Sequence, residues 1–242
     1  MPVSNENIRD QIGRLARELH GDPGEDVIDP EGMLLEVTEA AVRVLPGVDH
    51  AGVTLVTRRG SADRLAQLTS TAATGPVPKT VDALQEAHDE GPCFDAIWRE
   101  RTIRIDDVEF ETRWPAFVDS VRRETPVRSS LSMQLFIGDH ELGALNLYSE
   151  TPRLASPSLE DHANDLATHA AIALLEARRG QQFRSALASR DVIGQAKGML
   201  MERFSVDAAD AFSLLKRLSQ ERNIPLAQLA EHVIAAEKPP RT

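Results

Sequence analysis

The stretch SLSMQLFIGDHELGALNLYS, residues 130–149, decides the fold class. It predicts two β-strands, at 130–137 and 141–149, joined by the segment GDH at 138–140. Side chains alternate between the two faces of a strand. The second strand therefore presents Leu142, Ala144, Asn146 and Tyr148 on one face and Gly143, Leu145 and Leu147 on the other. Because helices surround these strands, we expect an α+β fold with an antiparallel sheet.

Upstream of this stretch, apolar periodicity and turn signals divide the chain into shorter elements. Helices are predicted at 6–20 and 31–45, the second stopped by Pro46 and Gly47. Strands at 51–57 and 65–71 with a turn at 59–63 give a hairpin signal. Further helices are expected near 80–89, at 93–99 and at 115–123, with a short strand at 102–105.

Downstream, from Ser158 onward, the sequence predicts only helices. The first helix carries residues spaced three and four apart, and such a seam of small side chains allows two helices to approach closely. Two interpretations stay open for this seam, a dimer contact and packing against the chain's own sheet. Its members are Ala163, Leu166, Ala170, Ala173 and Ala177.

Residues 186–237 predict three consecutive helices. Ser205 is the expected N-cap of the second, and Pro225 suits the first turn of the third. Leu187, Ile193, Ala196, Leu200 and Phe204 are expected to point inward from the first helix, and Phe204 and Phe212 to lie in the core.

The composition limits the classes of protein to consider. Of 242 residues, 41% are hydrophobic, which suffices for a packed core. The single cysteine, Cys93, excludes a disulfide framework and a Cys-rich zinc site. The first residues lack the apolar region of a secretory signal, and no apolar run reaches about 18 residues. We therefore expect a cytoplasmic protein without a membrane span.

The net charge of −11 is unevenly distributed along the chain. Residues 181–242 carry nine basic and seven acidic side chains, a net charge of +2, which leaves −13 on residues 1–180. This asymmetry hints at different partners for the two blocks. Chance variation in solvated faces explains it equally well.

No catalytic motif stands out, and we expect neither an enzyme nor a cofactor or metal site. His162 and His169 could share a helix face, but a metal site there would need further ligands. Cys93 is interpreted as a small buried hydrophobe rather than a reactive thiol. Trp98 and Trp114 either line a ligand pocket or fill the core.

Basic side chains form two clusters on the C-terminal helices. Arg190, Lys197 and Gly198 share one stripe of the first helix. A glycine inside a helix costs about 0.8–1 kcal/mol relative to alanine, and the close approach of another helix or a ligand backbone would offset this. The second cluster comprises Lys216, Arg217, Ser219 and Arg222. The clusters either bind phosphates or are ordinary solvated faces near a helix C-terminus.

The segment ASRDVIGQAKGMLM, residues 188–201, closely resembles the first helix of ANTAR domains. The later residues Ala208, Ala211, Leu215, Ser219, Asn223, Leu226, Ala230 and Val233 fit the same family, and the resemblance covers about 183–236. It implies a three-helix RNA-binding module of bacterial antitermination regulators, which binds paired hairpins in leader transcripts, usually as a dimer. It also implies RNA contacts from Arg190 and Lys197, with Gly198, Ala211, Ser219 and Arg222 as further site residues. Ala211 would serve close helix contact or the approach of RNA.

The region at about 30–178 resembles GAF domains, in the form found in GAF–ANTAR proteins of actinobacteria. The motifs are EGPC at 90–93, RWP at 113–115, VRS at 127–129 and LGALNLYS at 142–149. Thr125 and Pro126 depart from the glycine that commonly precedes Val-Arg-Ser, which affects the local loop. The resemblance implies a sensory and dimerisation module. The candidate residues of its ligand pocket are Cys93, Trp98, Trp114, Met133 and Tyr148.

The sequence thus predicts an N-terminal helical segment (1–29), a GAF sensor (30–178), an ANTAR RNA-binding domain (179–237) and a tail (238–242). The expected partners are leader-transcript hairpins, a second copy of the chain and an unknown small ligand in the GAF domain. Two alternatives stay open. One is a DNA-binding tail, although residues 206–209 offer no basic side chain for reading bases. The other is a ligand-binding or enzymatic GAF domain whose tail only dimerises.

Overall fold

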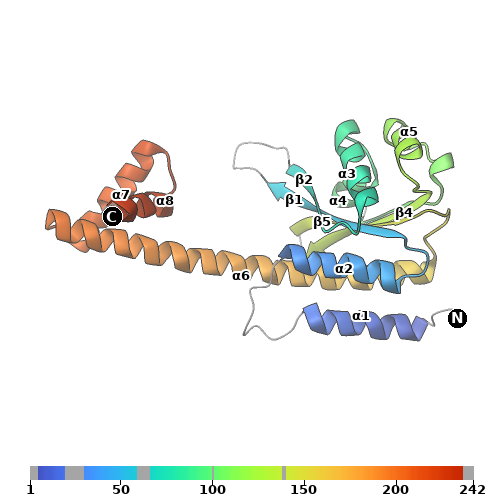
Figure 1. Cartoon of the computed structure of the whole chain (residues 1–242), viewed down its shortest axis with the longest axis horizontal. Coiled ribbons are helices and arrows are strands. Elements are labelled where there is room, and N and C mark those ends of the chain that lie inside the picture. The colour runs from blue at the N-terminus through green and yellow to red at the C-terminus, as the bar shows by residue number, and fades with distance from the viewer. Residues whose placement is uncertain (1–4, 20–29, 59–65, 100, 138–139, 237–242) are drawn as a thin grey trace, which may run out of the picture. The chain divides into compact units, whose positions relative to one another are not determined.

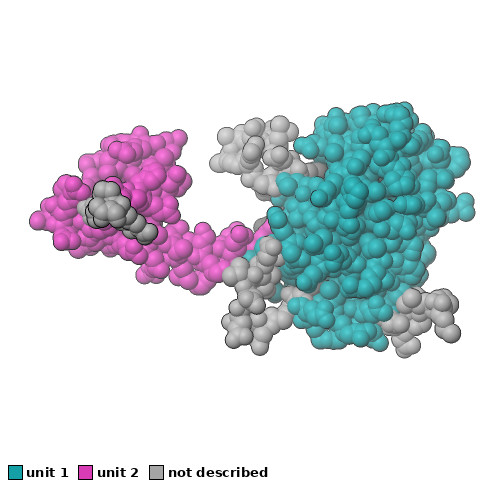
Figure 2. Space-filling model, viewed as in Figure 1, with its two compact units in different colours: residues 1–177 teal, residues 178–242 magenta. Residues whose placement is uncertain are grey.

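The computed structural model describes residues 5–19, 30–58, 66–99, 101–137 and 140–236. The chain divides into two compact units, Met1–Ala177 and Arg178–Thr242 (Figure 2). Helix α6 (Pro157–Phe204) has residues in both units. Each unit has a hydrophobic core of its own.

A five-stranded antiparallel sheet with the strand order β2-β1-β5-β4-β3 forms the centre of the first unit (Figure 1). The strands are β1 (His50–Arg58), β2 (Ala66–Thr71), β3 (Thr102–Ile105), β4 (Ser129–Ile137) and β5 (His140–Ser149). β5 lies between β1 and β4, so the stretch that decided the fold class supplies two of the three inner strands. The α+β class and the antiparallel sheet are confirmed. The predicted turns at 59–63 and 138–139 lie outside the described residues.

Helices cover both faces of this sheet (Figure 1). One face packs with α1 (Asn5–Leu19), α2 (Pro30–Val44) and the first part of α6, and the other with α3 (Pro76–His88), α4 (Pro92–Trp98) and α5 (Pro115–Glu124). A short 3-10 helix, η1 (Val108–Phe110), precedes α5. Leu145 and Leu147 of β5 enter the first core, whereas Tyr148 enters the second. The predicted alternation therefore holds for these three residues, and residues 143–149 of β5 are buried on both faces of the sheet.

The seam of small residues on α6 is buried in the first unit. Ala163, Leu166, Ala170 and Ala173 belong to the core that includes Leu145 of the sheet, and Ala177 is also buried. Of the two interpretations that the sequence allowed, packing against the chain's own sheet is the one observed for these residues.

The second unit packs the last part of α6 against α7 (Ala208–Arg222) and α8 (Leu226–Ala236). Its core is small and consists of Ala196, Leu200, Ala211, Leu215, Leu229 and Ala230 with a rim of half-buried apolar residues. Asp207, rather than Ser205, is the N-cap of α7, because its carboxylate accepts the N–H groups of Ala209 and Asp210. Pro225 directly precedes α8 instead of lying within its first turn.

The prediction that three apolar residues point inward was wrong. Leu187, Phe204 and Phe212 are 46%, 55% and 42% exposed. Leu187 lies on a stretch of α6, residues 181–188, in which every residue is exposed, and Phe204 is the last residue of that helix. Apolar spacing locates a helix face but does not say whether another element of the same chain covers it. Among the described residues, no helix is both long and apolar enough to cross a membrane.

Candidate functional site

The first candidate site is a stripe on the last part of α6. Arg190 is exposed, and Lys197 is half-buried beside the core residue Ala196. Gly194 and Gly198 are exposed one turn apart, and a Cβ added to either would meet no atom within 4 Å. The described chain therefore offers no close packing that would explain these helical glycines, and the space above them is open to another molecule.

The second basic cluster, on α7, separates into exposed and inward-facing residues. Lys216, Arg217 and Arg222 are exposed, and Arg217 lies 3.9 Å from Glu221. The Ser219 hydroxyl donates a hydrogen bond of 2.6 Å to the Ile224 carbonyl oxygen, which closes the turn between α7 and α8. Ser219 thus has a role inside the module.

The third feature is a cavity of about 130 Å³ between the sheet and helices α3 and α4. Polar side chains from several elements converge on it. Asp82 Oδ1 accepts hydrogen bonds from the Thr54 hydroxyl at 3.2 Å and the Gln85 amide at 3.4 Å. The lining residues are Thr54, Ser70, Lys79, Asp82, Ala83, Gln85, Glu86, Cys93 and Phe94.

The environment of Asp82 disfavours the ionised form of its side chain. Burial raises the pKa of Asp82 from 3.8 to about 6, although the nearby hydroxyls of Ser70 and Thr54 oppose the change. Its second oxygen, Oδ2, is buried and has no hydrogen-bond partner among the described residues. Such an oxygen is a strong acceptor without a donor.

Cys93 lies in the wall of this cavity and is 1% exposed. Its backbone N–H donates to Gln85 Oε1 at 2.8 Å. Burial, reinforced by the negative charge of Asp82, raises the pKa of the Cys93 thiol to about 12. At neutral pH the thiol is therefore protonated and a poor nucleophile, as expected of a small buried residue.

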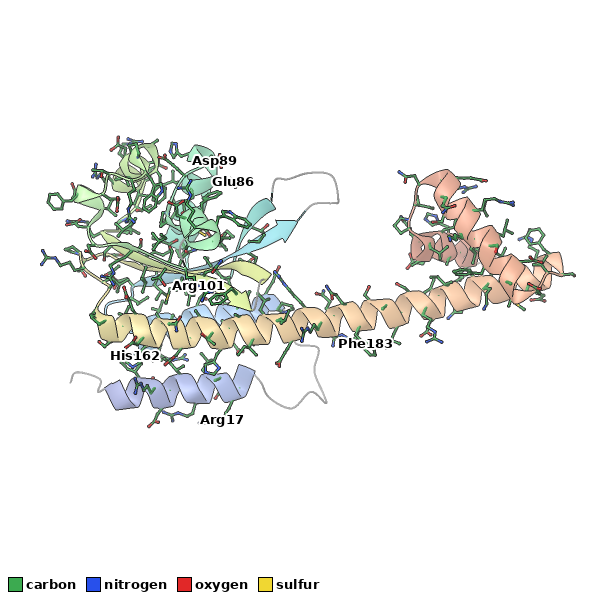
Figure 3. All side chains as sticks on the ribbon, turned by 180° about the vertical axis from the view of Figure 1, so that it is seen from behind. Arg17, Glu86, Asp89, Arg101, His162 and Phe183 are labelled. Carbon is green, nitrogen blue, oxygen red and sulfur yellow. The ribbon has the colours of Figure 1, made fainter. Side chains whose placement is uncertain are left out.

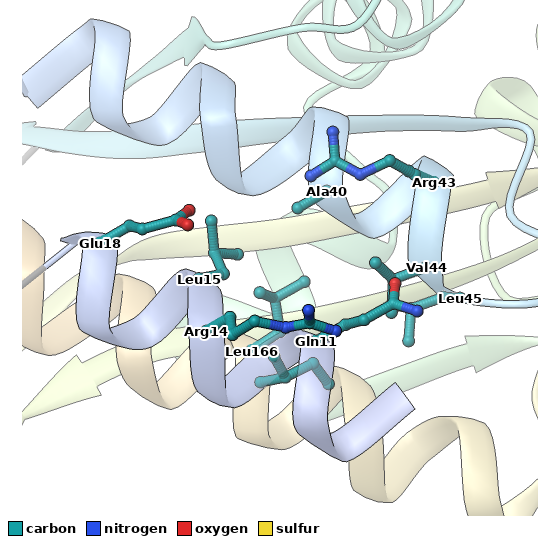
Figure 4. A pocket seen from close by; sticks show the side chains of 10 residues that line it. Gln11, Arg14, Leu15, Glu18, Ala40, Arg43, Val44, Leu45 and Leu166 are labelled. Carbon is teal, nitrogen blue, oxygen red and sulfur yellow. The ribbon is translucent and has the colours of Figure 1, made fainter. Parts of the chain in front are cut away.

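A second cavity of about 310 Å³ lies between α1, α2 and α6 in the first unit (Figure 4). Apolar residues such as Ile12, Leu15 and Leu166 form part of its wall. Its charged residues, Arg14, Glu18 and Arg43, are exposed. This cavity therefore has a solvated charged rim, unlike the buried polar cluster at Asp82. No group of three or more His, Cys, Asp or Glu residues able to hold a metal ion occurs in the described part of the chain.

Comparison with protein families assigns both units. Residues 27–175, more than half of the chain, match the GAF domain family. The chain belongs to the GAF domain family. Residues 181–234 match the ANTAR domain. The ANTAR domain implies RNA binding in transcription antitermination, and the GAF domain implies a sensor.

Solved structures share the GAF fold at low sequence identity. A free methionine-R-sulfoxide reductase from Neisseria meningitidis, in complex with its substrate, is 16% identical with a TM-score of 0.55, covering 73% of this chain and 93% of its own. The GAF domain of a phosphoenolpyruvate-protein phosphotransferase from Coxiella burnetii is 16% identical with a TM-score of 0.52, covering 74% and 99%. The corresponding domain from Acinetobacter is 16% identical with a TM-score of 0.53, covering 73% and 96%. No curated protein matches the chain.

Among the five pocket residues predicted for the GAF domain, Cys93 is the one that lines the Asp82 cavity. Trp98 is 45% exposed, and Met133 packs in the core on the opposite face of the sheet. Trp114 is a core residue whose Nε1–H donates to Asp95 Oδ2 at 3.2 Å. Tyr148 is buried in that same core.

The sequence analysis did not predict the polar residues of the GAF cavity, although the position of one of them in its helix could have indicated it. Gln85 follows the buried Val81 by four residues, so a polar side chain occupies a core position of an amphipathic helix. Asp82 carries no such signal, because its place in the cavity depends on Thr54 from a distant strand.

In the ANTAR domain, the predicted RNA-binding residues differ in their exposure to solvent. Arg190, Gly198 and Arg222 are exposed, and Lys197 is half-buried. Ala211 is fully buried in the three-helix core, where its small side chain makes close helix contact, the first of the two roles considered for it.

Proposed function

We propose that this chain is a cytoplasmic, non-enzymatic transcription antitermination regulator that binds paired hairpins in leader transcripts as a homodimer, with the GAF domain as its sensor. The observation that carries the RNA-binding assignment is the α6 stripe of the ANTAR domain, where Arg190 and Lys197 flank open space above Gly194. Cationic side chains beside small residues suit the close approach of a phosphate backbone. The kinship with the actinobacterial form is supported by the sequence motifs alone.

The α6 stripe is tested by replacing Lys197 with alanine in the full chain. Crosslinking with sequencing in the source organism identifies the bound transcripts, and a gel shift on their two-hairpin segments measures affinity. We expect Lys197→Ala to weaken binding about tenfold and to reduce its salt dependence. Arg9→Ala, at an exposed position of α1, also removes one positive charge and should leave RNA affinity intact. Wild-type affinity of a folded Lys197→Ala protein would refute the assignment.

The dimer is proposed from an exposed apolar patch on α6. Phe183 is 66% exposed (Figure 3) and lies one turn before Leu187, on the stretch where all residues from 181 to 188 are exposed. Large apolar side chains on a solvated helix favour burial against a partner. A second copy of the same helix offers a matching surface, because the contact between two copies is self-complementary.

Signal transfer is proposed to follow α6. This helix begins at Pro157 in the GAF unit, where its small residues pack under the sheet, and ends at Phe204 in the ANTAR unit. A ligand that alters packing in the GAF domain would change the spacing of two ANTAR modules and thus their fit to two hairpins.

Two observations disfavour the alternatives. The N-terminal end of α7, which would read bases in a DNA-binding tail, carries the acidic residues Asp207 and Asp210, and these repel phosphates. Competition between duplex DNA and hairpin RNA tests this directly. The protonated, buried thiol of Cys93 argues against thiol chemistry in the GAF domain.

A further inference from the structure

The cavity at Asp82 contains one buried acceptor that the described protein atoms leave unsatisfied, and the hydrogen-bond network beside it contains a second. Asp82 Oδ2 and Asn146 Oδ1 are both buried and lack a hydrogen-bond partner among the described residues. A buried acceptor without a donor costs about 1–3 kcal/mol, and more when it is charged. Asp82 belongs to the cavity lining, so a molecule bound there could supply the missing donor to Oδ2.

Three of the neighbouring donors are already committed to other acceptors, and the Ser70 hydroxyl, on an exposed residue, also acts on the Asp82 carboxyl group. Asn146 Nδ2 donates to the Thr54 hydroxyl at 3.0 Å, and this hydroxyl donates its single proton to Asp82 Oδ1. The Gln85 amide also points to Oδ1, and its own oxygen accepts from the Cys93 N–H. The network therefore fixes Asp82 in place while its Oδ2 remains available.

The charges around the cavity favour a cation. Asp82 and Glu86 lie one turn apart on α3, and both line the cavity; Figure 3 labels Glu86 on this helix. Lys79 is the single basic residue in the lining; both Lys79 and Glu86 are exposed, so the buried charge of the cavity is that of Asp82. Phe94 adds an aromatic surface, whose face attracts cations. An anion would meet two carboxylates, and a neutral ligand would leave the charge of Asp82 uncompensated.

The size of the cavity limits the ligand. A cavity of about 150 Å³ suffices for benzene, so the 130 Å³ of this cavity accommodate about five non-hydrogen atoms. This excludes a nucleotide or a tetrapyrrole from the cavity as it stands. A larger ligand would have to place only its cationic end here.

We propose that the GAF domain binds a small organic cation with N–H donors, an amidinium, guanidinium or primary ammonium group, through Asp82 Oδ2 in this cavity. The inference deepens the sensor role proposed above and depends on it only for its regulatory meaning. The larger cavity beside α1 is a weaker candidate, because its charged residues Arg14, Glu18 and Arg43 are exposed to solvent.

The proposal is tested with three probes of nearly equal shape and different charge. Acetamidinium, acetamide and acetate are titrated separately into the full-length protein by calorimetry. We expect acetamidinium to bind at least about tenfold more tightly than acetamide, because charge-assisted hydrogen bonds are about twice as strong as neutral ones, and acetate not to bind. Equal binding of acetamidinium and acetamide, or no detectable binding of acetamidinium, would overturn the proposal.

The site is located by a matched pair of variants. Asp82→Asn should lower acetamidinium affinity at least about tenfold, whereas Asp165→Asn, the same change at an exposed position of α6, should not alter it. If Asp82→Asn fails to fold, the Asp82 carboxyl carbon of the wild type is followed by NMR, and an unmoved signal at saturating acetamidinium contradicts the site. RNA affinity is measured without acetamidinium, so a failed titration leaves the antitermination proposal to its own gel-shift test.

Discussion

Replacing Asp82 by asparagine should stabilise the GAF domain at neutral pH. The native structure holds this carboxylate at a pKa of about 6 instead of 3.8, chiefly because burial disfavours the charged form. Each pKa unit corresponds to 1.36 kcal/mol, so ionised Asp82 lowers the free energy of unfolding by about 3 kcal/mol at most. Asparagine keeps the size of the side chain and removes the charge. We expect a gain of about 1–3 kcal/mol, part of the maximum being lost to imperfect hydrogen bonding of the new amide.

The pH dependence distinguishes this cause from a simple packing effect. Below about pH 3 the carboxyl group is protonated in both the folded and the unfolded state, and ionisation contributes nothing. Between pH 4 and 6 the unfolded chain loses the proton first, so wild-type stability falls as the pH rises. Above pH 6 both states are ionised and the loss stays constant. The stability difference between Asp82→Asn and wild type should therefore grow between pH 4 and 7.

Urea unfolding followed by tryptophan fluorescence measures this difference. Trp98 and Trp114 are the two tryptophans of the chain, and both lie in the GAF domain, so the signal reports on that domain alone. Asp165→Asn serves as control, with no pH-dependent difference expected. A difference between Asp82→Asn and wild type that is the same at pH 4.5 and pH 7.5 would refute the reasoning, because no charge would then be involved.

Three further changes test other parts of the structure. Gly143→Ala should destabilise the GAF domain by roughly 2–4 kcal/mol in urea unfolding, because the backbone has φ +154 and the added Cβ would collide with the Thr54 carbonyl oxygen; near-wild-type stability would contradict this. Ser219→Ala should cost the ANTAR domain about 1 kcal/mol by thermal unfolding, since the hydrogen bond to Ile224 is lost, and an unchanged melting temperature would show that the bond contributes nothing. Leu187→Glu should shift the protein from dimer to monomer in light scattering after size exclusion, while the exposed control Gln181→Glu should not; a dimer that persists would move the interface elsewhere.

The sequence predicted the elements of the sheet better than the surroundings of the helices. β3 was predicted to the residue, because a short alternating run between breaks admits few other structures. Leu187 was placed in the core, since periodicity identifies an apolar face without naming what covers it. Ser205 was preferred to Asp207 as N-cap, but Ser205 adopts a left-handed φ of 51° just after α6, and Asp207 then takes the capping position.

The candidate sites also show what a sequence pattern can and cannot predict. The α6 stripe lies within one helix, so spacing alone places Arg190 and Lys197 on a common side. The hydrogen-bond network at Asp82 combines Thr54 of β1, Asp82 of α3 and Asn146 of β5, which are neighbours only after the sheet has formed. A local sequence pattern cannot predict contacts between residues so far apart in the chain. Of the two roles that the sequence left open for Trp114, the structure shows core packing beside α5.

The position of β5 in the sheet also determines the order in which elements can fold while the chain is being synthesised. β1 pairs with β5, so His50 meets Tyr148 only after most of the GAF sequence has been made. Domains of a growing chain generally fold as units, the N-terminal one first. We expect β1 to pair with β5 only after β5 has been synthesised. The first turns of α6 would then pack against the core. The helices α7 and α8 follow the GAF domain in the chain, so we expect the GAF domain to fold before them.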